Sequence, residues 1–373
     1  GRSPSALRLI LPESCLEGPS VETDIMEVNN TMSRYLREGR FQEYPNALIY
    51  VERTLDSGKV RRGLVGVVAL EQYDYEPGTA CAVRATEGVV LSRIPPRVAV
   101  RKNAPIELPH AILLSDCGDI VAPLASRTGE MEPLYDFELM EGGGYVKGWL
   151  LTQEQQEQTA RAIRARKEWA DRERGGLLFV AGDGNHSLAA AKECYERRKE
   201  MTDPSRWHEL PSRYALCELV DLSDNGVDFE PIHRVVFGVK PEELLDALMK
   251  YCPSAVRGRE EGHVLPFVIS RWSQGEITVT KPAANLPVDT LQRFLDDYTA
   301  AHPKARVDYI HGEAEARALA EEREDAVAFL LPRPRWPELF DAVVRDGLLP
   351  RKTFSIGRAK DKRFYLEARK IRK

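Results

Sequence analysis

Residues 177–199 read LLFVAGDGNHSLAAAKECYERRK, and their pattern is the most informative in the sequence about the fold class. Leu177–Ala181 is a continuous apolar run of the length typical of a buried strand. Gly182–Ser187 follows as a tight turn, and residues 188–199 predict a helix that begins directly after it. A strand, a turn and a helix in immediate succession indicate a protein that contains βα units.

The turn at Gly182–Ser187 has the chemistry of an anion site. A turn that leads into a helix N-terminus exposes unpaired N–H groups, and the helix dipole adds partial positive charge there. Such a place suits a phosphate or a carboxylate. The residues expected to contribute are Gly182 and Gly184 by close backbone approach, Asn185, His186 and Ser187 by donating hydrogen bonds, and Asp183 by binding Mg²⁺ or accepting a proton. Ser187 could equally be only an N-cap of the helix, which would make the turn purely structural.

Outward from this stretch, hairpins and helices alternate. Residues 21–38 and 152–174 predict helices, the second starting with a capping box between Thr152 and Gln155. Residues 46–55 and 60–73 predict a strand hairpin, because a Gly-containing turn joins them. Pro95-Pro96 argues against a helix at that point. The fold class expected is therefore mixed α+β.

Three parts are expected along the chain. Residues 1–240 form a phosphate-binding catalytic core, and residues 241–345 form a smaller α/β unit that begins near Lys240-Pro241. Residues 346–373 form a basic C-terminal hairpin that packs back on the core. From residue 351 onward there are ten Lys and Arg against two acidic residues. This excess is either a solvated edge or a cationic wall that faces an anionic ligand.

The charge and cysteine composition of the chain argue against several classes of function. The 373 residues include 53 Lys and Arg and 58 Asp and Glu, a net charge of −5, which argues against nonspecific nucleic-acid binding. No apolar run approaches the roughly 20 residues of a membrane span, so no membrane partner is expected. The six cysteines lack metal-ligand spacing and suit a reducing compartment, so the expected location is cytoplasmic. The expected partner is a small anionic molecule, and the sequence indicates no oligomeric state.

Three further segments combine basic residues with a polar partner. Arg84-Ala85-Thr86-Glu87-Gly88, followed by Arg93, suits an anion cradle with Glu87 as a general base. His233-Arg234 suits a phosphate. Arg351-Lys352 lies within the basic C-terminal part. The alternatives are solvated arginines on an edge strand and a structural histidine.

Several motifs in order resemble one family over essentially the whole chain. They are RATEG at 84–88, RIPPR at 93–97, GDGNHS at 182–187, PIHR at 231–234 and PRKTF at 350–354. Together they are similar to the bacterial family known as domain of unknown function 1015. More distantly, the GDGNHS turn with its strand and Ala-rich helix resembles the box of the ParB/sulfiredoxin-like fold.

In the free-serine kinases of that fold the box reads Asp-Gly-His-Thr-Arg, the turn holds phosphates, and an upstream Glu acts as base. The resemblance implies a ParB/sulfiredoxin-like core with elaborations. It also implies a metal or hydroxyl role for Asp183 and a base role for Glu87. Ser187 stands where the kinases have Arg, so Arg84, Arg93 or Arg234 would have to supply that charge.

These observations predict a phosphotransferase that uses Mg²⁺ and moves a phosphoryl group from pyrophosphate or a nucleotide to a small hydroxyl compound, most concretely free L-serine. Glu87, Asp183 and His186 are the expected catalytic residues. Arg84, Arg93, His233, Arg234, Arg351 and Lys352 are expected to bind phosphate. The alternatives are a phosphatase for phosphoserine-like esters, a non-catalytic nucleotide-binding switch, and a scaffold in which the turn is only a cap.

Overall fold

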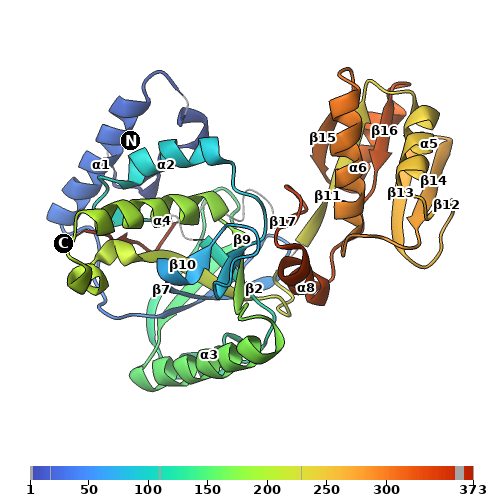
Figure 1. The fold of residues 1–373 in the computed structure, drawn as a ribbon. Helices are drawn as coiled ribbons and strands as arrows, with labels where there is room; N and C mark the ends of the chain where they lie inside the picture. The colour runs from blue at the N-terminus through green and yellow to red at the C-terminus, as the bar shows by residue number, and fades with distance from the viewer. Residues whose placement is uncertain (1–2, 17, 109–110, 228, 358–364, 373) are drawn as a thin grey trace. The chain divides into compact units, whose positions relative to one another are not determined.

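The computed structural model describes residues 3–16, 18–108, 111–227, 229–357 and 365–372 (Figure 1). The chain divides into two compact units. The first consists of Gly1–Val227 and Arg358–Lys373, and the second consists of Asp228–Gly357. The first unit is therefore built from two separate stretches of chain, with the second unit inserted between them.

The first unit is built on a nine-stranded sheet in the order β3-β4-β9-β6-β10-β2-β1-β8-β7. Its strands are β1 (Ile49–Thr54), β2 (Val60–Ala69), β3 (Tyr73–Asp74), β4 (Val83–Ala85), β6 (Ala111–Ser115), β7 (Glu132–Glu138), β8 (Tyr145–Leu150), β9 (Phe179–Asp183) and β10 (Tyr214–Asp221). β3, β4 and β9 are mutually parallel, and so are β6 and β10, whereas the remaining neighbours are antiparallel. The predicted hairpin is confirmed as β1 and β2.

Four α-helices and several 3₁₀ turns complete the described part of the first unit. The helices are α1 (Val21–Arg37), α2 (Ile94–Arg101), α3 (Gln153–Glu173) and α4 (Asn185–Glu200). The 3₁₀ turns are η1 (Ala6–Leu9), η2 (Glu13–Cys15), η3 (Leu70–Gln72), η4 (Leu91–Arg93), η5 (Ala122–Glu130), η6 (Pro204–Glu209) and η7 (Pro211–Arg213). α1 and α3 match the predicted helices, and the predicted capping box of α3 is present.

α2 corrects the expectation drawn from the two prolines. The helix begins at Ile94, so Pro95 and Pro96 lie in its first turn. Proline is tolerated there because the first N–H groups of a helix have no intrahelical partner. α2 packs on α4 through Ile94, Val98 and the alanine-rich face of α4, and the two helices run side by side (Figure 1).

The main core of the first unit joins the sheet to α4 and α3. Tyr50 and Tyr73, both fully buried, lie in it together with Leu188 and Tyr195 of α4. Ala162 and Ile163 of α3 pack against the same cluster. Burial of this apolar surface holds α4, and with it the end of β9, against the sheet.

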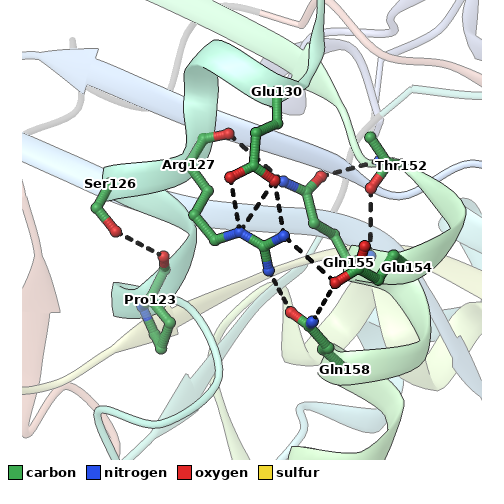
Figure 2. A network of polar contacts seen from close by, with 8 residues as sticks. All are labelled: Pro123, Ser126, Arg127, Glu130, Thr152, Glu154, Gln155 and Gln158. Atoms are coloured by element: carbon green, nitrogen blue, oxygen red, sulfur yellow. Dashed lines mark hydrogen bonds and ion pairs between the residues drawn. The ribbon is translucent and has the colours of Figure 1, made fainter.

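A polar network also ties the start of α3 to η5 (Figure 2). The Thr152 hydroxyl accepts from Gln155 N at 3.3 Å, and the Gln155 side chain accepts from Thr152 N at 2.9 Å. Gln155, which is fully buried, also donates to the backbone oxygen of Arg127. Arg127 in turn forms an ion pair with Glu130 at 2.6 Å. The capping box thus gives the N–H groups of Thr152 and Gln155 side-chain acceptors at this helix end.

A small second sheet joins the two stretches of the first unit. β5 (Ile106–Glu107) pairs with β18 (Arg369–Lys370) in an antiparallel manner. The buried carboxylate of Glu107 accepts from Arg369 Nε at 2.7 Å and also forms an ion pair with Arg101. Burial alone would raise the pKa of Glu107, but the charges of Arg101 and Arg369 hold it below its ordinary value.

The second unit is an antiparallel seven-stranded sheet with helices. Its path is β12-β14-β13-β16-β11-β15, and β17 pairs separately with β11. The strands are β11 (Phe229–Phe237), β12 (Ala255–Arg257), β13 (His263–Ser270), β14 (Ser273–Val279), β15 (Arg306–His311), β16 (Ala326–Phe329) and β17 (Phe354–Ile356). The helices are α5 (Pro241–Tyr251), α6 (Pro287–Ala301), α7 (Glu313–Glu321) and α8 (Trp336–Asp346).

With hairpins and βα units in the nine-stranded and seven-stranded sheets, the chain is a mixed α+β protein, as predicted. The C-terminal part differs from the expected hairpin. β17 pairs with β11, while β18 pairs with β5, so the two segments have different partners. Residues 358–364 of that segment lie outside the described residues. In the part of the chain that the structure describes, no helix has the length and apolar composition to cross a bilayer.

The capping box yields a prediction about stability. Thr152→Ala removes the hydroxyl that accepts from Gln155 N, and it should lower the free energy of unfolding by about 1 kcal/mol. Urea denaturation followed by circular dichroism measures the change. Ser126→Ala is the matched control, because its exposed hydroxyl only donates to the nearby Pro123 carbonyl. Equal losses in both variants would contradict a specific role for the cap.

Candidate functional site

The turn between β9 and α4 is a single residue. The strand continues through Asp183, Gly184 is the N-cap, and the helix begins at Asn185. The sequence predicted a turn over Gly182–Ser187 and a helix from residue 188, so the helix starts three residues earlier than expected. Gly184 makes this possible because its φ of 85° and ψ of 19° reverse the chain within one residue.

Gly184 also meets a neighbouring strand. A Cβ atom at this position would lie 3.0 Å from the Cα atom of Ala111 in β6, tighter than ordinary contacts. Left-handed backbone and close approach therefore both require glycine here. Because Gly184 is the N-cap, Ser187 is not the cap that the sequence left open as an alternative, but the third residue of the helix.

The first turn of α4 presents backbone donors. Leu188 is the first residue whose N–H bonds back within the turn, to Gly184 O at 2.9 Å. The N–H groups of Asn185, His186 and Ser187 therefore have no acceptor within the helix itself. Together with the helix dipole, they make this end of α4 suitable for an anion.

Asp183 is the last residue of β9 and lies next to the first turn of α4. Its Oδ1 atom accepts from Gly184 N at 3.0 Å, which leaves the carboxylate at the sheet edge. Tyr365, from the second stretch of the first unit, lies within electrostatic reach of it. Burial raises the pKa of Tyr365, and the charge of Asp183 raises it further. No sequence signal pointed to Tyr365, which is 182 residues away along the chain.

The 84–90 segment lies beside the turn. β4 and β9 are parallel, with Val83 opposite Phe179 and Ala85 opposite Ala181, so both strands end at one edge of the sheet. The buried Thr86 hydroxyl donates to Ala181 O at 2.8 Å. Thr86 belongs to the RATEG motif, and no pattern in the sequence predicts this contact of its side chain.

His186 connects the same segment to α4. Val90 N donates to His186 Nε2 at 3.0 Å. An accepting Nε2 carries no proton, so this geometry assigns the neutral imidazole with its proton on Nδ1. Glu87, half-buried, is thus bracketed between two contacts with the turn, one through Thr86 and one through Val90.

Asn185 contributes an unsatisfied acceptor. Its Nδ2 atom donates to Ala181 O at 3.3 Å, and its backbone oxygen accepts from the Tyr73 hydroxyl at 3.3 Å. Its Oδ1 atom is buried and has no hydrogen-bond partner among the described residues. Buried polar atoms are nearly always paired, so this oxygen is a place where a ligand donor would be stabilised.

The two upstream arginines have different surroundings. Arg84 is buried, and its guanidinium donates to Cys81 O at 2.9 Å and to Gly175 O at 2.6 Å. Gly175 precedes β9, whereas Asp183 ends it, so these contacts hold Arg84 at the opposite end of the strand from Asp183. Arg93 is exposed at the start of α2, and its side chain has no ion pair with any described residue.

The remaining predicted residues belong to the second unit. Arg234 is fully buried in β11 and donates to Lys352 O at 2.9 Å, to Arg351 O at 3.1 Å and to Gln292 Oε1 at 3.0 Å. Arg234 thereby holds the turn that precedes β17 by its carbonyl groups. The side chains of Arg351 and Lys352 are exposed, and Lys352 lies over the Tyr309 ring at 5.3 Å.

His233 is buried next to Arg234. Its Nδ1 atom accepts from Leu331 N at 3.1 Å, which requires an unprotonated Nδ1. Burial lowers the pKa of His233, although the charge of Glu313 opposes this shift. His233 and Arg234 therefore both pair with backbone groups inside the second unit.

The chain belongs to a family described as "Protein of unknown function (DUF1015)", whose model matches residues 1–298. This match confirms the family resemblance inferred from the motifs. No curated protein sequence matches the chain.

Solved structures resemble the chain weakly. A free serine kinase variant in complex with AMP has 10% identity and a TM-score of 0.44, covering 83% of this chain and 92% of its own. SbnI with a C-terminal truncation, from Staphylococcus aureus, has 9% identity and a TM-score of 0.41, covering 79% and 83%. A conserved hypothetical protein from Pyrococcus furiosus has 12% identity and a TM-score of 0.41, covering 83% and 95%. Similarities this weak do not indicate what activity the chain has.

Gly184 allows a test of the turn. Gly184→Ala should lower the free energy of unfolding by more than the roughly 1–2 kcal/mol that a left-handed residue costs, because Ala111 must also move. Gly39→Ala is the control, since Gly39 has a φ of 64° but nothing within 4 Å of its Cβ position. Urea denaturation compares the two. A loss in Gly184→Ala no greater than in the control would show that the approach to Ala111 is unimportant.

His233 predicts a pH dependence. Because burial lowers its pKa in the folded state, the unfolded chain binds more protons once the pH falls below the ordinary value of about 6.5. The free energy of unfolding should therefore decrease as the pH falls through that value. His233→Asn keeps an acceptor for Leu331 N and should reduce this decrease. His208→Asn, at an exposed position in η6, should not. An unchanged pH profile in His233→Asn would refute the assignment.

Proposed function

We propose that this chain is a phosphotransferase that moves a phosphoryl group from pyrophosphate or a nucleotide to a small hydroxyl compound, most concretely free L-serine. The observation that carries the proposal is the first turn of α4, which begins behind Gly184 at the edge where β4 and β9 end. Backbone donors, a helix dipole and the Asp183 carboxylate meet there. This combination suits a phosphate ester better than a neutral ligand.

The donor phosphates would bind to the N–H groups of Asn185, His186 and Ser187. The buried Oδ1 atom of Asn185 supports the acceptor side of the proposal. It needs a hydrogen-bond donor, and free serine carries both an ammonium and a hydroxyl group.

Glu87 is the proposed general base. Thr86 and Val90 hold the segment that carries it against the turn, which favours this carboxylate over others of the unit. In the step, the acceptor hydroxyl oxygen forms a bond to the transferred phosphorus while the bond from phosphorus to the leaving oxygen breaks. The leaving phosphate or nucleotide keeps that electron pair, and the hydroxyl proton passes to Glu87.

Mg²⁺ fits this site only as an ion bound jointly by the protein and by the phosphates of the substrate. Among the described residues, no group of three or more His, Cys, Asp and Glu side chains gathers as a metal site. Mg²⁺ is commonly bound by one or two carboxylates together with substrate phosphates and water, which matches a single carboxylate. Asp183 would hold it, and the ion would neutralise phosphate charge.

Arg93 is the proposed source of further positive charge, since its exposed side chain has no ion pair within the described chain. Arg84 is not included, because its guanidinium is bound to two carbonyl groups away from this edge. His186 is proposed to position the 84–90 segment through Val90. The roles of His233, Arg234, Arg351 and Lys352 in the second unit stay predictions.

Two carboxylate variants test the proposal. With Mg²⁺, L-serine and ATP, ADP or pyrophosphate, Glu87→Gln should lower the rate of phosphoserine formation by roughly 10²–10⁴-fold, because it removes the proton acceptor. Asp183→Asn should lower it as well, while keeping an oxygen for Gly184 N. Glu22→Gln, on the exposed first turn of α1, is the control. Mass spectrometry measures the product.

Full activity in Glu87→Gln with a native circular dichroism spectrum would remove Glu87 from the mechanism. Release of phosphate from phosphoserine, with water as the only acceptor, would indicate a phosphatase instead. Ligand binding without turnover would indicate a nucleotide-binding switch. A thermal shift detects such binding, since a ligand at 100 times its Kd stabilises the native state by about 2.7 kcal/mol.

A further inference from the structure

A basic cavity lies at the C-terminal end of α4. It has a volume of about 340 Å³ and is formed where α2 and α4 end, against residues 371–372 that follow β18. The charged residues that line it are all cationic: Arg101, Lys102, Arg197, Arg198 and Arg372. No acidic side chain is among the described residues of its lining. The cavity therefore concentrates one sign of charge.

Only part of this charge is neutralised by neighbours. Arg101 forms an ion pair with Glu107, and Arg197 pairs with Glu193 at 2.7 Å. Arg198, Lys102 and Arg372 form no ion pair with a carboxylate of the described residues. Glu209 lines an adjoining cavity together with Arg198 and Arg372, but it forms an ion pair with Arg206, at 3.3 Å.

The cationic side chains of the cavity also influence one another and the Cys194 thiol, which lines the same cavity. Arg372 donates to Asn103 Oδ1 at 3.2 Å, a neutral acceptor. Burial lowers the pKa of Arg372, and the charge of Arg198 lowers it further, so these two guanidinium groups repel. Burial raises the pKa of the Cys194 thiol in the same cavity, and the arginines at 101, 197 and 198 oppose that rise.

Helix dipoles do not account for this cluster. Basic residues are favoured in the last turn of a helix, which explains Arg101 in α2 and Arg197 and Arg198 in α4. Arg372 belongs to neither helix, yet its side chain lines the same cavity. A third chain segment that adds an unneutralised cation to two helix ends indicates a site for an anion.

We propose that this cavity binds a small anion that carries phosphate groups. Guanidinium groups bind phosphate oxygens in pairs, Ser212 and Asn103 offer further donors, and Val98 and Ile371 supply an apolar wall. The volume lies within the range of small-molecule sites. Arg198 is 14 residues beyond Gly184 on α4, about 20 Å along the helix, so this site is separate from the proposed catalytic one.

The test is isothermal titration of the full chain with pyrophosphate at low ionic strength. The double variant Arg198→Gln/Arg372→Gln should weaken one class of binding site by roughly 100-fold, about tenfold for each charge-assisted interaction removed. Arg161→Gln/Arg164→Gln, on the exposed face of α3, makes the same change in net charge and should leave that class unchanged. If the double variant does not fold, Lys102→Gln, at an exposed position, replaces it with an expected loss of about tenfold.

Binding that is unchanged in the cavity variant, or weakened equally by the α3 control, overturns the proposal. So does a wild-type chain that binds no pyrophosphate. The outcome is distinguishable from that of the proposed function. If the wild-type chain shows one class of pyrophosphate site, and the cavity variant binds pyrophosphate with the same affinity, the cavity is not a binding site. That result does not affect the proposed catalytic site at the start of α4. If the wild-type chain shows one class of pyrophosphate site, and the cavity variant loses it, the cavity is the binding site. Pyrophosphate is then not the phosphoryl donor that binds at the start of α4.

Discussion

The close approach of Gly184 to Ala111 is the constraint on which the candidate site depends. β6 and β9 are antiparallel neighbours, with Ile112 opposite Asp183, so the chain that leaves β9 passes directly over the start of β6. A Cβ atom on Gly184 would lie 3.0 Å from the Cα atom of Ala111, so Ala111 would have to move by a few tenths of an ångström to admit it. A longer turn would move the first turn of α4 away from the sheet edge, and the backbone donors would no longer lie beside Asp183. The single-residue reversal thus sets the distance between the first turn of α4 and the Asp183 carboxylate.

Two hydrogen bonds, together with the packing of Val89 on the apolar cluster of α2 and α4, hold the other wall of the site. Thr86 bonds to the backbone of β9, and Val90 bonds to the His186 ring. Hydrogen bonds restrict direction as well as distance, so they fix the orientation of the segment that carries Glu87. They also explain a histidine in the first turn of α4 without requiring it to transfer a proton. The same residue type that suggested catalysis from the sequence has a positioning contact in the structure.

Local patterns predicted much of the fold, and long-range pairing accounts for the rest. The apolar run at Leu177–Ala181 and the Thr152 capping box depend on neighbouring residues, and both are found. Pro95-Pro96 was misinterpreted because prolines end a helix in its interior but start one in its first turn. The β4–β9 pairing that brings Glu87 to the turn joins residues almost 100 apart, and no local pattern indicates it. A sequence cannot show which carbonyl groups a buried guanidinium will meet, so the contacts of Arg84 and Arg234 with backbone oxygens could not be predicted.

The β5–β18 pair has a consequence for the order in which the chain folds. Glu107 and Arg369 are 262 residues apart, and the whole second unit is synthesised between them. While a ribosome makes the chain, the second unit can therefore emerge and fold before the first is closed. Until Arg369 is available, the Glu107 carboxylate lacks one of its two cations, and leaving a charge in an apolar interior without its partner is costly. The first unit thus begins first and is completed last, with its final stabilising contacts delayed until translation has passed the inserted unit.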